Sequence, residues 1–191
     1  MKSETKTKKP TLRASLNLLE KEDLIEIILE LSKFNPKNKN FIEISISGSD
    51  NINFDEIVKT AKSKIHTYIF GRGLTSRNVL KLREAKKVIS DHAKLLKDYP
   101  EHIADLKLYY IETCHNFTED FGDINEQFYD SIMNAFENFC DYILKHHRLY
   151  TMFKERIEKY YENSRGFGWG YSDGISDIYS EFIVKIDNVI S

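Results

Sequence analysis

The sequence is poor in helix-breaking residues and lacks the long apolar runs that cross membranes. Its 191 residues include only three prolines and eight glycines. The longest apolar stretch, residues 24–31, is interrupted by Glu26 and Glu30, whereas a membrane-spanning helix needs about 20 mostly apolar residues. Residues 1–10 are polar and basic, and no apolar segment follows them. We therefore expect no signal peptide, no membrane contact and a cytoplasmic location.

Cysteine is also scarce. Cys114 and Cys140 lie within helical patterns among apolar neighbours, and a disulfide would need an oxidising compartment, of which the sequence gives no sign. We expect two buried thiols. Neither cysteine belongs to a recognisable Cys/His pair, and the sequence has no G-x-S-x-G motif, so nothing in it supports nucleophilic catalysis.

The rest of the sequence is dominated by apolar side chains at helical spacing. The sequence is 41% hydrophobic and 30% charged, with twelve Phe and eleven Tyr, which is typical of a packed protein. The pattern predicts an all-α fold of about eight amphipathic helices, arranged as a compact antiparallel bundle or as a short array of helix pairs. The expected helices lie near residues 12–19, 21–34, 54–68, 75–97, 103–117, 128–144, 149–163 and 173–190.

Some boundaries follow from capping residues. Residues 53–56 and 123–126 have the composition of capping boxes, and Thr75 can cap the helix that runs to Lys97. The helix at 21–34 is apolar on two sides, so we expect it to be well enclosed. Residues 41–46 alternate like a strand, but no second strand is predicted to pair with them, which leaves a helix or an extended connector.

The predicted domain organisation is simple. Residues 1–10 form a disordered tail, and residues 11–191 form a single helical domain. Within that domain, residues 11–50 form an N-terminal helical subdomain that packs on residues 51–191.

Charge is distributed unevenly along the chain. Residues 54–100 carry 11 Lys/Arg against 5 Asp/Glu, whereas residues 101–191 carry 8 against 17. If the basic side chains of residues 59–97 gather on one surface, they suit phosphates and nucleic acid, with Arg77, Lys81 and Lys87 as candidate binding residues. Alternatively, they pair with the acidic half, within the molecule or across a dimer, or are simply solvated.

A glycine-rich segment is the most unusual local feature. It comprises Gly166, Gly168, Gly170 and, four residues further on, Gly174, with the sole tryptophan, Trp169, among them. The glycines allow a tight turn, which we expect to begin at a helix end near Gly166 and to let Trp169 fill the core. The alternative is a ligand pocket at this turn, with Asp173 and Asp177 behind it on one helix face.

Glu112 and His115 form an E-x-x-H pair, a spacing found in di-metal helical bundles. The sequence has no second pair of this kind, so we expect no metal site and a surface or capping role for His115. The acidic residues 119–126 do not follow the spacing of an EF-hand loop. They are expected to cap helices.

Three blocks of sequence point to a family. They are LLEKEDLI at residues 18–25, FTEDFGDI at 117–124 and GFGWGYSDGISDIY at 166–179. Together these blocks resemble a family of small, mainly bacterial, helical proteins catalogued as a domain of unknown function. The resemblance implies the helical architecture and no activity. Glu20 stands where the family usually has a capping serine, which weakens the cap of the helix that follows.

These features favour a non-enzymatic protein-binding or scaffolding module that engages another protein or its own copy, with no cofactor. One alternative is nucleic-acid binding through the basic 59–97 surface. The other is a small-molecule or metal-dependent enzyme with a pocket near Trp169, Asp173 and Asp177.

Overall fold

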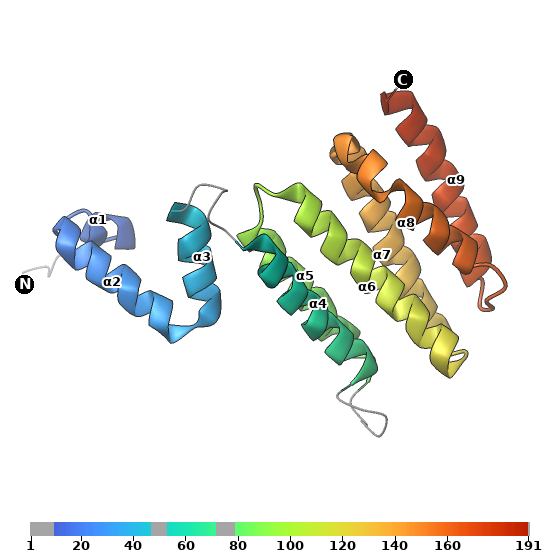
Figure 1. Cartoon of the computed structure of the whole chain (residues 1–191), viewed down its shortest axis with the longest axis horizontal. Helices are drawn as coiled ribbons and strands as arrows, with labels where there is room; N and C mark the ends of the chain where they lie inside the picture. Colours follow the sequence, from blue (N-terminus) through green and yellow to red (C-terminus); the bar gives the residue numbers. More distant parts are fainter. Residues whose placement is uncertain (1–9, 47–52, 72–78, 191) are drawn as a thin grey trace, which may run out of the picture. The chain divides into compact units, whose positions relative to one another are not determined.

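A computed structural model describes residues 10–46, 53–71 and 79–190 (Figure 1). The chain divides into two units, Met1–Ile52 and Asn53–Ser191. All regular structure in the described ranges is helical, which confirms the predicted all-α fold. None of the helices in these ranges is long and apolar enough to cross a membrane.

The first unit contains α1 (Leu12–Leu16), α2 (Lys21–Phe34) and α3 (Pro36–Ile46). Asn35 is extended between α2 and α3, as expected before a proline, and its side chain accepts a hydrogen bond from the backbone N–H of Lys37. Residues 41–46 belong to α3, which resolves the ambiguous stretch as helix. As expected, Glu20 makes no side-chain capping bond at the start of α2.

No residue of α1, α2 or α3 is buried. The expectation that the helix at 21–34 is well enclosed is therefore not met within this unit. The helix packs against α3, but one neighbour cannot cover a helix that is apolar on two sides.

The second unit holds the core. Its helices are α4 (Phe54–Phe70), α5 (Leu82–Leu95), α6 (Pro100–Phe121), α7 (Glu126–Lys145), the short 3-10 helix η2 (His147–Leu149), α8 (Tyr150–Asn163) and α9 (Tyr171–Ile190). Helix α6 packs against α4, α5 and α7, and α7 also packs against α9 (Figure 1). The largest fully buried side chains are aromatic: Tyr110, Tyr129, Tyr171, Phe136, Phe139 and Phe182.

The two predicted capping boxes have different outcomes. Asn53 caps α4 by accepting a 3.0 Å hydrogen bond from the N–H of Glu56, whose carboxylate in turn accepts a bond from the Asn53 side-chain amide. In the second box the capping residue is Asn125, which accepts a 2.9 Å bond from the N–H of Phe128. Asp123 accepts instead from the Tyr129 hydroxyl, at 2.9 Å.

The helix predicted for residues 75–97 begins at Leu82, later than expected. Thr75 lies outside the described residues, but residues 79–81 are not helical. The N–H groups of Leu80 and Lys81 donate to the carbonyls of Ile69 and Tyr68, at 2.9 and 2.8 Å. These bonds fold the chain back along the end of α4, and a backbone N–H used in that way cannot extend α5.

The predicted division into a disordered tail and one helical domain remains a prediction. Residues 1–9 of the expected tail lie outside the described ranges. The packing of residues 11–50 on residues 51–191 remains a prediction.

Candidate functional site

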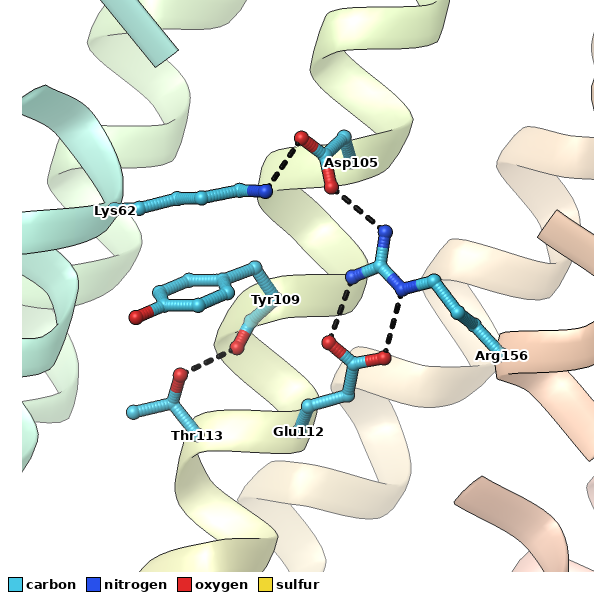
Figure 2. A network of polar contacts seen from close by, with 6 residues as sticks. All are labelled: Lys62, Asp105, Tyr109, Glu112, Thr113 and Arg156. Atoms are coloured by element: carbon cyan, nitrogen blue, oxygen red, sulfur yellow. Dashed lines mark hydrogen bonds and ion pairs between the residues drawn. The ribbon is translucent and has the colours of Figure 1, made fainter. Parts of the chain in front are cut away.

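Four charged side chains join α4, α6 and α8 in a network of ion pairs (Figure 2). Arg156 donates to both oxygens of Glu112, at 2.9 and 2.7 Å, and to Asp105 at 2.7 Å. Lys62 lies 2.7 Å from the other oxygen of Asp105. The side chains are 22–35% exposed, so water screens the pairs only partly. Burial acts to lower the pKa of Arg156, but its two carboxylate partners raise it overall.

In the structure, the two residues of the E-x-x-H pair, Glu112 and His115, have different partners. Both oxygens of Glu112 are occupied by the guanidinium of Arg156, whereas His115 contacts a different set of side chains. The two residues therefore do not act on a common ligand. Within the described ranges, no group of three or more His, Cys, Asp or Glu side chains is placed to hold a metal ion.

His115 lies at the centre of a group that we call the His115 cluster. In it His115, Tyr160 and Tyr171 are buried, Phe167 is partly buried and Glu119 is exposed. The Tyr171 hydroxyl lies 3.2 Å from His115 Nδ1 and 2.8 Å from the Tyr160 hydroxyl. On the other side of the ring, Nε2 lies 3.4 Å from Glu119 Oε1. The rings of Tyr160 and Phe167 meet His115 edge to face, at 5.7 and 5.0 Å between centroids.

The expected surface or capping role for His115 is wrong, because its side chain is only 2% exposed. Helix α6 continues to Phe121, so His115 lies well inside it. Burial lowers the pKa of His115, and the charge and hydrogen bonding of Glu119 oppose that shift. Burial also raises the pKa values of Tyr160 and Tyr171. The cluster is therefore neutral at its centre, with one carboxylate at its rim.

The glycine-rich segment forms the turn over the His115 cluster. Gly166 and Gly170 have φ of +86° and +69°, a region that glycine adopts without steric cost. Between them, Phe167 packs on His115 and Tyr171. The expectation that Trp169 fills the core is wrong: its side chain is 55% exposed and its φ is +57°. Phe167 is the aromatic side chain that points inward.

Gly174 does not belong to this turn. It lies inside α9, where a Cβ would meet the sulfur of Met133 on α7. Its role is to let α7 and α9 approach closely.

Asp173 and Asp177 are both exposed, one turn apart on α9. This agrees with the predicted shared helix face, and a carboxylate in the first turn of a helix is favourable without any ligand. Neither carboxylate has an ion-pair partner among the described residues.

Some basic side chains of residues 59–97 contact other helices, and others are exposed. Lys62 belongs to the ion-pair network, and Lys86 donates a 2.8 Å hydrogen bond to Ser131 on α7. Lys87 is exposed and Lys81 is partly buried, whereas Arg77 lies outside the described residues. The exposed basic side chains of α5 and the residues just after it are Arg83, Lys86, Lys87, Lys94 and Lys97, of which Lys86 makes the bond to Ser131.

The cysteines are buried free thiols, as predicted. Burial raises the pKa of Cys114 to about 12 and also raises that of Cys140, which keeps both protonated and unreactive.

Several residues that organise the second unit carried no distinctive sequence signal. Arg156 and Asp105 are ordinary charged positions on amphipathic helices, and Tyr160 and Phe167 read as core aromatics. They could have been recognised only by knowing which helices are neighbours.

Comparison with known proteins identifies a family but no function. The sequence profile of a family of unknown function, DUF6155, matches residues 7–183, in agreement with the resemblance of the three sequence blocks. No curated protein matches the chain, and no solved structure does.

The ion-pair network predicts that Arg156→Ala lowers the free energy of unfolding by about 2 kcal/mol. The substitution leaves Asp105 and Glu112 half-buried without the cation that they share. Because both carboxylates are partly exposed, the loss is smaller than for a fully buried pair. Urea denaturation measures it. The matched control is Lys154→Ala on the same helix, whose exposed pair with Glu158 is worth at most about 0.5 kcal/mol. Equal effects of the two substitutions would refute a structural role for the network.

The exposure of Trp169 predicts that Trp169→Ala changes the free energy of unfolding by about 1 kcal/mol or less, since little buried area is lost. Phe136→Ala, at a fully buried aromatic, should cost about 3–5 kcal/mol. Thermal and urea unfolding of both variants provide the comparison. A loss for Trp169→Ala as large as that for Phe136→Ala would mean that the indole is a core residue.

Proposed function

The chain belongs to the family of unknown function DUF6155, and from its own surfaces we propose that it is a cytoplasmic, bacterial, non-enzymatic protein-binding or scaffolding module. The observation that carries this proposal is the uncovered apolar surface of α2 in the first unit. His115 and both cysteines are buried.

Helix α2 carries six large apolar side chains that neither α1 nor α3 covers. Their exposure ranges from 37% for Ile27 to 83% for Phe34, and the full set is Ile25, Ile27, Ile28, Leu29, Leu31 and Phe34. A single exposed apolar residue is ordinary, but a contiguous set on one short helix is typical of an interaction surface.

The size of this unit strengthens the argument. A segment of about 40 to 50 residues rarely buries enough surface to be stable alone, and burying one Leu or Ile side chain is worth roughly 1.5–3 kcal/mol. Covering the apolar face of α2 with a complementary helical surface therefore supplies stability that the unit lacks. The partner is another protein or a second copy of this chain.

Substituting Leu29 and Phe34 by Glu tests the proposal. Both side chains are exposed, so the helix should still form, but a charge at either position should abolish docking on an apolar partner. We expect the full chain to self-associate or to retain specific proteins from a cell lysate, and the double variant to lose that property. Light scattering after size exclusion, together with pull-down from lysate, gives the readout.

Lys33→Glu is the matched control, because it changes the net charge by as much as the double variant on the same helix, at an exposed polar position. It should leave association intact. The proposal would be refuted if the wild type is monomeric and retains the same proteins from the lysate as the double variant. A monomer whose thermal stability falls with Leu29→Glu and Phe34→Glu would mean that α2 is covered within its own molecule.

A second candidate function is nucleic-acid binding, favoured by the basic side chains of α5. Arg83, Lys87 and Lys94 are four and seven residues apart, a spacing that places them along one helix face, and Lys97 follows. None of the four has an ion-pair partner among the described residues, so all are available to phosphates.

A gel shift with double-stranded DNA or RNA tests this candidate. Binding should weaken steeply with salt, because each contacted phosphate releases counterions, and Arg83→Glu with Lys87→Glu should abolish it. Lys154→Glu, an exposed basic position on α8, is the control and should have a much smaller effect. No shift at low salt, or equal loss in both variants, would exclude binding through α5.

A further inference from the structure

The turn at residues 164–170 covers a buried histidine whose ring nitrogens face two different groups. We propose that this turn is a pH-sensitive latch: it stays closed while His115 is neutral, and it separates from His115 when that ring takes up a proton. Opening would expose the rings of Phe167 and His115 at the surface of the second unit.

The direction of the hydrogen bonds explains why protonation disrupts the closed state. Because Nε2 faces the Glu119 carboxylate, the neutral ring carries its hydrogen on Nε2 and accepts at Nδ1. The Tyr171 hydroxyl, 3.2 Å away, then donates to Nδ1, and the Tyr160 hydroxyl, 2.8 Å from that of Tyr171, donates to Tyr171. A protonated ring carries a hydrogen on both nitrogens, so Nδ1 must then donate to Tyr171. The Tyr171 oxygen then accepts from His115, and whichever way the bond between Tyr171 and Tyr160 runs, one of the two hydroxyl hydrogens is left without an acceptor in a buried position.

The groups that face His115 from each packed element determine whether the neutral or the protonated ring is favoured. Tyr160 from α8 and Tyr171 from α9 are neutral hydroxyls, and Phe167 from the turn is apolar. Among the described residues, Glu119 on α6 is the carboxylate that faces the ring. It favours the protonated ring, but it is 44% exposed and therefore partly screened. Asp123, near Gly168, accepts a hydrogen bond from Tyr129.

The turn is the element able to respond. Tyr160 lies inside α8, and Tyr171 is the first residue of α9. Phe167 instead lies between Gly166 and Gly170, whose positive φ values mark the two ends of a tight reversal. Phe167 contacts the cluster through edge-to-face ring contacts with His115 and Tyr171, at 5.0 and 6.1 Å. Releasing the turn admits water to the imidazolium without breaking a helix.

The sign of the pH dependence follows from burial. An unfolded histidine has a pKa of about 6.5, and burial lowers the pKa of His115 in the folded protein. The closed state therefore binds fewer protons than the open one. The latch is fully closed above about pH 6.5 and opens as the pH falls through the lowered pKa.

Trp169 is the sole tryptophan of the chain and lies in the latch, so its fluorescence reports latch position directly. We expect the emission of the full chain to change in one transition that lies below about pH 6.5, while far-ultraviolet circular dichroism stays constant. His115→Gln keeps a hydrogen-bond acceptor for Tyr171 but cannot be protonated, so the transition should disappear. Glu119→Gln should move it to lower pH.

His66→Gln is the matched control, because His66 is exposed on α4 and its substitution should leave the transition unchanged. If His115→Gln fails to fold, nuclear magnetic resonance of the wild-type histidine side chains provides the test instead. The His115 ring must then titrate over the same pH range in which the tryptophan emission changes. A flat emission profile, a transition that survives His115→Gln, or a transition that coincides with loss of helix would overturn the proposal.

Discussion

The enclosure of α6 is the constraint on which the rest of the second unit depends. Twelve of its 22 residues are buried, so most of its circumference faces other helices rather than water. Polar side chains on such a helix have to find partners inside the protein. Asp105 and Glu112 find them in Lys62 and Arg156, His115 in Tyr171, and Thr118 in the Tyr129 hydroxyl, 2.6 Å away. The polar groups of one helix thus determine which faces of α4, α7, α8 and α9 turn toward it.

Much of the fold follows from the spacing of apolar residues, because helical periodicity is a local property. The helices predicted near 21–34, 54–68 and 149–163 correspond closely to α2, α4 and α8. The start of α5 could not be predicted in this way. It depends on hydrogen bonds from Leu80 and Lys81 to the end of α4, and a capping residue such as Thr75 carries no information about that tertiary contact.

The candidate site was less predictable for the same physical reason. The glycines at 166 and 170 correctly indicated a tight turn, but the choice between Phe167 and Trp169 as the inward ring depends on side-chain direction within the turn. Trp169 adopts a positive φ and points outward. The burial of His115 depends on α8 and α9 lying over that part of α6, which no pattern within residues 100–121 encodes.

The Arg156 network also has a consequence for the order of folding. Arg156 joins Glu112 and Asp105 across 44 and 51 residues of sequence, and Asp105 continues the connection to Lys62 on α4. Contacts between such distant segments require costly loop closure, so we expect them to form after the helices have collapsed together. Interactions formed after the transition state slow unfolding without accelerating folding. The network would then act chiefly as a kinetic barrier that keeps the assembled helices from separating.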